Sequence, residues 1–191
     1  MVKVGKVPVV PALSCSAIER KARQLIQLSY PELLGTPGAF PVDHFFERKL
    51  RAILRFDYDV AALPPGIEGV TDPIDRVLTL SPDTYDALQL GDGRARFTTA
   101  HEIGHVTLHP KYLREIIVDK RGALRLCRSD IPPYRDPEYQ ANAFAGALLM
   151  PAVHVARMLS SGEGIGGLVR TFNVSWQAAE VRVNKLHLFL K

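Results

Sequence analysis

Apolar residues recur at helical spacing along most of the chain. Near the N-terminus, Ser16 and Glu19 have the spacing of a capping box, and an apolar stripe follows from Ile18 to Ile26. This pattern predicts a first helix that ends before Pro31. Further helices are expected over residues 41–53, 94–108, 137–150, 164–172 and 176–188.

Short apolar stretches typical of strands interrupt this helical pattern. Ile67–Val70 and Arg76–Leu80 flank Thr71–Asp75, where aspartate and proline favour a turn. They predict an antiparallel hairpin, and Glu115–Val118 with Ala123–Cys127 predicts a second one. The expected fold class is therefore α+β, mainly helical, with a small antiparallel sheet.

Composition narrows the class of protein. The 191 residues are 47% hydrophobic and 23% charged, which suits one domain with a real core. We expect an N-terminal arm over residues 1–15 and one domain over 16–191 that includes a C-terminal helical segment at about 164–188. No run of 18 apolar residues exists, so no contact with a membrane is expected.

Cysteine usage and charge bear on compartment and partners. Cys15 and Cys127 form no CxxC pair and are too few for a disulfide scaffold, so we expect a reducing, cytoplasmic setting. The net charge of +4 comes from dispersed residues rather than a dense basic tract. Direct DNA binding is therefore not expected from charge alone.

One motif carries recognisable chemistry. His101, Glu102 and His105 form a His-Glu-x-x-His pattern inside the helix predicted at 94–108. Four residues turn a helix by about 400°, so the two imidazoles lie about 40° apart, one turn along, and can share one metal ion. Glu102 is placed to reach a water held by that ion, as a general base. Gly104 makes sense if another backbone packs closely there.

A catalytic zinc ion needs a third protein ligand. Glu138 is the preferred candidate, because it lies in the first turn of its predicted helix, where the helix dipole favours a carboxylate. Asn142 lies one turn on and is expected to hydrogen-bond a ligand histidine from the second shell of the site. Cys127 is the competing third ligand. Manganese or iron would also suit histidine and carboxylate ligands.

Substrate contacts and the oxyanion stabiliser stay open at this level. His109 falls two turns beyond His101 and is a candidate for an outer contact, a substrate contact or a helix cap. The other candidates share a polar side chain near the motifs and are Tyr112, Tyr134, Tyr139 and Arg135. The strand Arg76–Leu80 is either an ordinary sheet strand or an edge that adds a substrate backbone.

Two separate blocks resemble one known family. Residues 97–105, followed by His109, are similar to the active-site helix of the ImmA/IrrE metallopeptidases, and residues 138–145, running into 148–151, resemble the second block of that family. The resemblance implies a zincin-like zinc peptidase with Glu138 as third ligand. It further implies a bacterial or phage setting, a role in transcription regulation or stress response, and a protein substrate that is a repressor of the XRE helix-turn-helix type. Many relatives carry a fused helix-turn-helix domain at the N-terminus, and the space before residue 40 is too short for one.

Two other hypotheses compete with the peptidase. Residues 168–183 have a helix-turn-helix rhythm, which would suit a DNA-binding regulator. The alternative is a helix pair packed on the peptidase, with its apolar side chains turned inward: Val174, Ala178, Val181 and Leu186. A non-catalytic protein-binding relative is the third hypothesis, and the intact Glu102 argues against it.

Overall fold

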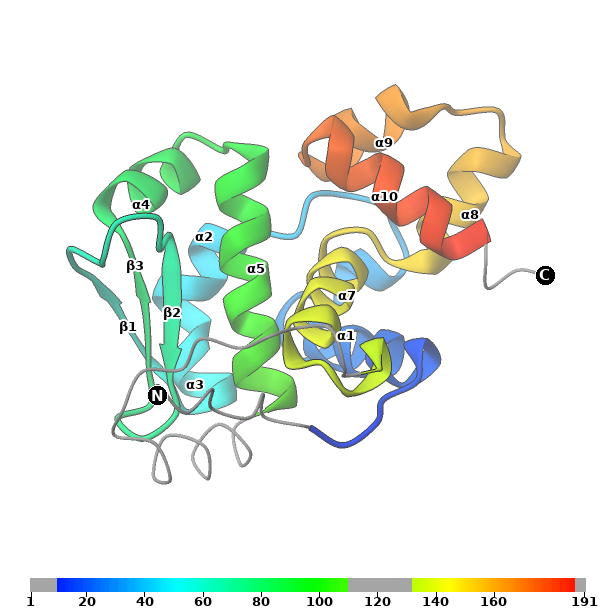
Figure 1. Cartoon of the computed structure of the whole chain (residues 1–191). Coiled ribbons are helices and arrows are strands. Elements are labelled where there is room, and N and C mark those ends of the chain that lie inside the picture. The colour runs from blue at the N-terminus through cyan, green and yellow to red at the C-terminus, as the bar shows by residue number, and fades with distance from the viewer. Residues whose placement is uncertain (1–9, 110–131, 188–191) are drawn as a thin grey trace.

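The computed structural model describes residues 10–109 and 132–187 (Figure 1). Its helices are α1 (Cys15–Ser29), α2 (Val42–His44), α3 (Leu50–Leu54), α4 (Pro82–Gln89), α5 (Gly93–Leu108), α7 (Pro137–Leu149), α8 (Ala152–Ser160), α9 (Ile165–Phe172) and α10 (Trp176–His187). Single helical turns occur at η1 (Pro31–Leu34), η2 (Phe45–Lys49) and η4 (Pro133–Arg135), and the strands are β1 (Asp57–Val60), β2 (Gly69–Asp72) and β3 (Val77–Leu80). The expected mainly helical α+β class is confirmed.

The sheet is small and mixed rather than antiparallel. Strand order is β1-β3-β2, with β2 antiparallel and β1 parallel to the central β3. The expected hairpin is present, and its turn is held by Asp72 Oδ1, which accepts from the backbone N–H of Ile74 and Asp75. Because β3 is paired on both sides, the idea that Arg76–Leu80 offers a free edge is wrong. Among the described strands, β2 is the edge that faces α5 (Figure 1).

Local capping explains where the helices of the site begin. Asp92 Oδ1 accepts from the N–H of Arg94 and Ala95 at the start of α5. Asp136 Oδ1 accepts from the N–H of Glu138, with Pro137 at the first helical position, as the sequence predicted for α7. These two caps fix the registers of the helices that carry the motif residues.

Three helix predictions need correction. The cap of α1 is Ser14, whose Oγ accepts from Ala17 N at 3.2 Å, so the capping box expected at Ser16 and Glu19 is wrong. Both α4 and α8 were not predicted. Each is short and follows directly on a neighbouring element, and α8 begins immediately after the Pro151 that ends α7. The helix expected from Pro41 is present as α2, a π-helical turn at η2, and α3 in succession.

The core is centred on α7, which lies between α5 and α1 (Figure 1). Gly104 of α5 faces the backbone of Ala141 in α7, where an added Cβ would lie 3.1 Å from the Ala141 carbonyl oxygen. The close approach expected at Gly104 is therefore confirmed. It brings the motif helix and the Glu138 helix close enough for their side chains to meet.

The C-terminal helix pair packs on this core. Arg96 of α5 is 5% exposed, and its guanidinium donates to the carbonyl oxygens of Phe40 and Asn173, each at 2.8 Å. Gly93 meets the turn before α10, where a Cβ would lie 2.6 Å from Ser175 N. The Ser175 hydroxyl accepts from Ala178 N, which agrees with the predicted cap.

The inward face of α10 differs from the expected one. Val181 is 46% exposed, so its predicted inward position is wrong, and Ala178 is half-buried. Buried positions of α10 are Ala179, Arg182, Val183 and Leu186. Arg182 Nε donates to the Met150 carbonyl oxygen, and its Nη2 lies 2.6 Å from Glu19 Oε1 as an ion pair that lacks hydrogen-bond alignment. The buried position is therefore taken by the ion-paired Arg182, whereas the apolar pattern of the sequence assigned it to Val181.

Within the described residues, no single helix has the length and apolarity needed to cross a membrane. One pair, α7 with α8, meets those criteria when taken together across a 57° bend. The second predicted hairpin, Tyr112 and Cys127 lie outside the described residues.

Candidate metal centre and active site

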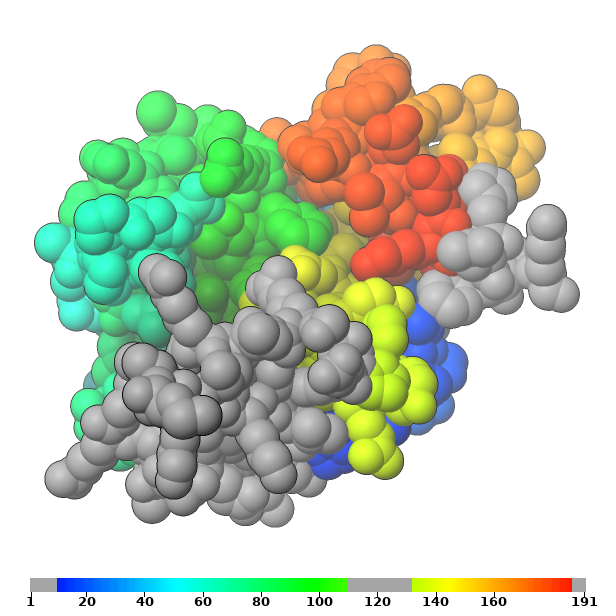
Figure 2. Space-filling view, viewed as in Figure 1, coloured from blue at the N-terminus to red at the C-terminus, as the bar shows by residue number. Residues whose placement is uncertain are grey.

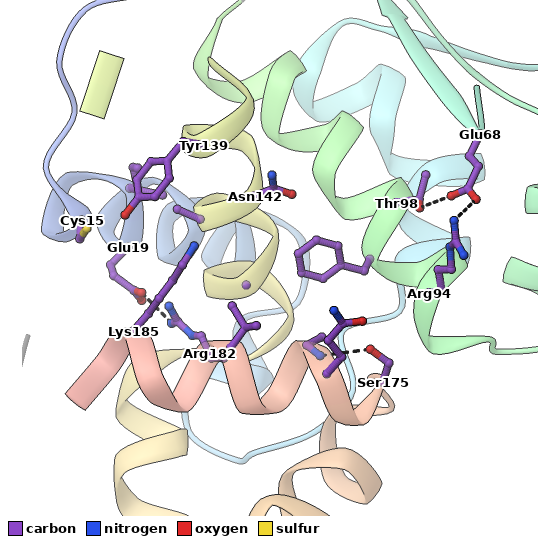
Figure 3. A pocket seen from close by; sticks show the side chains of 17 residues that line it. Cys15, Glu19, Glu68, Arg94, Thr98, Tyr139, Asn142, Ser175, Arg182 and Lys185 are labelled. Carbon is purple, nitrogen blue, oxygen red and sulfur yellow. Dashed lines mark hydrogen bonds and ion pairs between the residues drawn. The ribbon is translucent and has the colours of Figure 1, made fainter. Parts of the chain in front are cut away.

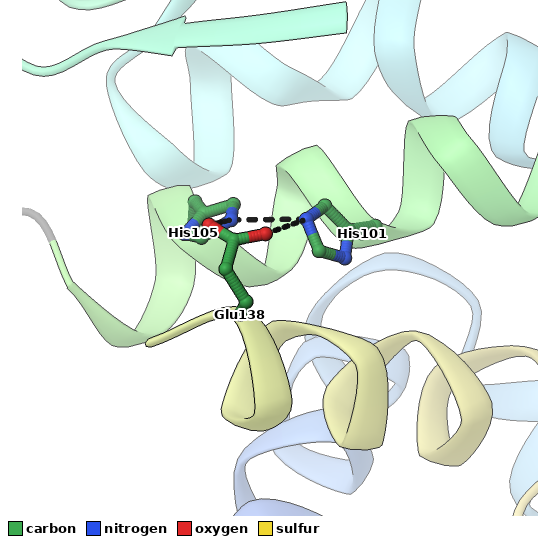
Figure 4. Close-up of side chains that lie close together, drawn as sticks. All are labelled: His101, His105 and Glu138. Carbon is green, nitrogen blue, oxygen red and sulfur yellow. Dashed lines mark hydrogen bonds and ion pairs between the residues drawn. The ribbon is translucent and has the colours of Figure 1, made fainter. Parts of the chain in front are cut away.

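Three side chains from two helices converge on one point (Figure 4). His101 and His105 project from the same face of α5, with their Nε2 atoms 3.0 Å apart. Glu138, in the first turn of α7, places Oε2 at 3.3 Å from His101 Nε2 and Oε1 at 3.3 Å from His105 Nε2. The structure therefore brings together the three residues that the sequence nominated as metal ligands.

The spacing of these atoms fits a tetrahedral metal ion. Two ligand atoms that each lie 2.0–2.1 Å from a tetrahedral centre are separated by about 3.3 Å, close to the three contacts of this cluster. Two ring nitrogens that face each other at 3.0 Å also need a proton or a cation between them. The ligand set of two imidazoles and one carboxylate suits zinc and leaves a fourth position for water or substrate.

The electrostatics within the cluster are strongly coupled. Hydrogen bonds with His101 and His105 hold the pKa of the Glu138 carboxyl far below its usual range. Burial lowers the pKa of His101, but its hydrogen bond to Glu138 and the charge of Glu102 raise it, and the net direction is upward. Glu138 is thus a carboxylate under ordinary conditions, which is the form that a metal ligand requires.

Glu102 lies beside the cluster, between α5 and the sheet edge. Its side chain is buried, and Oε2 accepts a hydrogen bond from Thr71 Oγ1 of β2 at 2.7 Å. Gly69 leaves room for it, because a Cβ there would lie 3.0 Å from Glu102 Cγ. Sequence reasoning missed both β2 residues, since their closeness to Glu102 depends on the sheet packing against α5.

Each ligand histidine has a second partner on its Nδ1. His101 Nδ1 lies 3.0 Å from Asn142 Oδ1, the contact that the spacing of the α7 residues predicted. His105 Nδ1 lies 3.2 Å from His109 Nδ1, and His109 Nε2 lies 3.0 Å from Gln140 Oε1. Gln140 was not singled out in the sequence, because a buried glutamine in an apolar helix carries no motif signal.

His109 is fully enclosed at 1% exposure, and burial lowers its pKa to about 4. Of the options that the sequence left open, the structure has the outer contact, and His109 is also the C-cap residue of α5. Tyr134, on η4, is 51% exposed, and its carbonyl oxygen binds Gln140. Tyr139 is turned toward Cys15 (Figure 3). No hydrogen bond places either tyrosine or Arg135 at the cluster among the described contacts.

A cleft of about 570 Å³ adjoins the cluster. It lies between α1, α5, α7 and α10, and Figure 2 shows the surface hollowed between the green α5 and the red α10. Asn142, the partner of His101, lines it beside Phe97 and Thr98 (Figure 3). Val181 and Lys185 of α10 line the other side, so α10 forms one wall. The cleft therefore has apolar and polar walls and is linked to the cluster through Asn142.

A histidine pair on one helix, joined by a glutamate from a second helix, defines a metallopeptidase-like protein. In agreement, the model of the Peptidase_M78 family, described as the IrrE N-terminal-like domain, matches residues 87–184. This match spans about half of the chain and includes the whole cluster, and the chain belongs to this family. The resemblance noted in the sequence is thereby confirmed.

A solved structure shares the fold. A chain described as a Mycobacterium tuberculosis transcriptional regulator superposes with a TM-score of 0.56 at 17% sequence identity. The alignment covers 85% of this chain and 44% of the regulator, so this chain spans less than half of that protein. A search of curated proteins gives no significant match.

Proposed function

We propose that this protein is a metalloendopeptidase that hydrolyses peptide bonds of a protein substrate. The observation that carries the proposal is that the ligand atoms of His101, His105 and Glu138 lie within 4.8 Å of one another, with Glu102 directly after His101 in α5. Membership of the Peptidase_M78 family supports it. Zinc is the preferred metal, and manganese or iron would suit the same ligands.

The residues divide the chemistry among themselves. A bound divalent ion would act as a Lewis acid and bring the pKa of a water ligand toward neutrality. His101, His105 and Glu138 would hold the ion. Glu102 accepts the proton of the attacking water and returns it to the leaving nitrogen. Thr71 orients the Glu102 carboxylate through the 2.7 Å hydrogen bond, so that the second oxygen is free to take the proton.

The β2 edge is the proposed position of the substrate backbone. Among the described strands, β2 pairs on one side alone, and its Thr71 contacts Glu102. An extended peptide added to this edge would carry its carbonyl past Glu102 and the ligand cluster. The 570 Å³ cleft then offers space for substrate side chains.

The proposed substrate is a helix-turn-helix repressor of the XRE type. This step rests on the family resemblance and on the fold shared with a protein titled a transcriptional regulator. The competing function is a DNA-binding or protein-binding regulator that uses the α9 and α10 pair. This second function is favoured by Trp176 at the start of α10, because its side chain is 58% exposed.

The test incubates the zinc-loaded protein with a purified XRE-type repressor from the same genome. The expected result is one or two discrete fragments from the wild type, none after chelation and none from Glu102→Gln. The amide is nearly isosteric with the carboxylate but cannot take the proton. Specific DNA binding by this chain in a mobility-shift assay, without cleavage of the repressor, would support the regulator instead.

A further inference from the structure

The orientation of the Gln140 side chain is determined by its partners. Gln140 is fully buried, and its Nε2 lies 2.9 Å from the Pro11 carbonyl oxygen and 2.8 Å from the Tyr134 carbonyl oxygen. Both partners can accept but cannot donate, so the nitrogen must face them. The reverse orientation would place the amide oxygen against two carbonyl oxygens. Gln140 Oε1 therefore faces His109 Nε2, 3.0 Å away.

This orientation sets the direction of every hydrogen bond in the chain of contacts. An amide oxygen only accepts, so His109 Nε2 carries a proton and donates it. In neutral imidazole the other nitrogen then accepts, and His109 Nδ1 faces His105 Nδ1 at 3.2 Å. His105 must therefore carry its proton on Nδ1. With Nδ1 protonated, Nε2 is the nitrogen that a metal takes, and without a metal it faces His101 and Glu138, which can share a proton with it.

We propose that His109 and Gln140 are positioning residues that keep a proton on His105 Nδ1, so that Nε2 is the nitrogen that binds the metal. The inference rests on the proposed metal site but assigns a role to two residues that touch neither metal nor substrate. Gln140 also anchors the backbone at Pro11 and Tyr134, so the tautomer of His105 depends on the segment before α1 and on η4.

The other ligand has a weaker arrangement. The Nδ1 of His101 meets Asn142, which is exposed and has no second hydrogen bond among the described contacts to fix which way its amide faces. Rotation of that amide would reverse the direction of the hydrogen bond. His105 is therefore the ligand whose tautomer is determined by its partners. Asn142→Ala removes the exposed partner of His101 and is the variant to compare with His109→Leu.

Two variants of His109 separate positioning from packing. His109→Leu keeps a side chain of similar bulk in the buried position but offers no acceptor to His105 and no donor to Gln140. His109→Asn is smaller and polar, but its Oδ1 takes the place of His109 Nδ1 and accepts from His105. If the role is positioning, zinc affinity falls about 10–100-fold in His109→Leu and is largely retained in His109→Asn. Both variants lose the donor to Gln140, so they differ in bulk and in the acceptor for His105. A role that depends on bulk alone would give the opposite order, because leucine fills the space better than asparagine.

Zinc affinity is measured by competition with a chromophoric chelator, and the tautomer is read by ¹⁵N NMR of histidine side chains in metal-free wild type. The expected spectrum has a pyrrole-like Nδ1 for His105, and zinc affinity is expected to be lower in His109→Leu than in His109→Asn. A pyridine-like Nδ1 on His105, or equal zinc affinity in wild type and His109→Leu, would overturn the inference. Wild type that binds no zinc would instead contradict the proposed function, and the NMR measurement would still decide the tautomer.

Discussion

Substitution of Gly104 tests whether the contact between α5 and α7 builds the site. A Cβ at this position would lie 3.1 Å from Ala141 O, 3.2 Å from Ala141 Cα and 3.3 Å from Phe144 Cδ1. Two of these atoms belong to helix backbone and cannot move alone. Gly104→Ala should gain about 1 kcal/mol of helix propensity and lose about 1–3 kcal/mol to overpacking. We therefore expect a net loss of about 0–2 kcal/mol in the free energy of unfolding.

Gly104→Ala should also lower the affinity for zinc, and by more than the small loss in the free energy of unfolding would suggest. To relieve the clash, α7 must move by a few tenths of an ångström from α5, and Glu138 moves with it away from His101 and His105. We expect zinc affinity to fall about tenfold, at the lower end of the effects seen for groups that orient metal ligands. Chemical denaturation and chelator competition measure the two quantities.

Gly146→Ala is the matched control, since Gly146 lies in the interior of α7 and its nearest contact is Arg182 Cδ at an ordinary 3.5 Å. It should raise the free energy of unfolding by about 0.5–1 kcal/mol and leave zinc affinity unchanged. The reasoning fails if Gly104→Ala stabilises the protein as much as Gly146→Ala does and binds zinc as tightly as wild type.

Three further predictions concern other parts of the site and fold. The lowered pKa of Glu138 stabilises the folded, metal-free protein above the ordinary carboxyl pKa of 4.5, and this stability is lost as the pH falls below it. Lowering the pH from about 6 to about 3 should therefore reduce the free energy of unfolding, measured by urea denaturation, more in wild type than in Glu138→Gln. Equal losses in the two proteins would refute the coupling. Gly69→Ala should push on Glu102 and lower turnover while zinc affinity stays unchanged, as chelator competition alongside a cleavage assay would show. Arg96→Met leaves two carbonyl oxygens without their donor, and a loss of about 2–3 kcal/mol in denaturation is expected, whereas a loss near zero would contradict its role in holding α9 and α10.

The site was largely readable from the sequence because its determinants are local. His101, Glu102 and His105 share one helix, and the asparagine partner of His101 lies one helical turn beyond Glu138. Helix geometry alone then relates the members of each block. The contact between α5 and α7 joins segments that are distant in the sequence. The sequence indicated it only through small residues such as Gly104 and Ala141 at that contact.

What the sequence did not reveal depends on packing between distant segments. The four residues of β1 alternate polar and apolar, a signal that the sequence analysis overlooked in so short a segment, and most of them are exposed. Their parallel pairing with β3 went unpredicted, because it joins segments that are separate in the sequence. The inward face of α10 was misassigned at Val181, because burial of Arg182 depends on Glu19 from α1. Gln140 matters through carbonyl groups at Pro11 and Tyr134, and no spacing rule links those positions.

The most direct test of the central claim is metal-dependent hydrolysis by the protein itself. A peptide library from a digested proteome would be incubated with zinc-loaded wild type and with zinc-loaded Glu102→Gln, and new termini would be counted by mass spectrometry. The account predicts new termini from wild type that disappear on chelation and are absent with Glu102→Gln. A wild type that produces no more new termini than Glu102→Gln, although both bind one zinc ion, would contradict the assignment as a metallopeptidase.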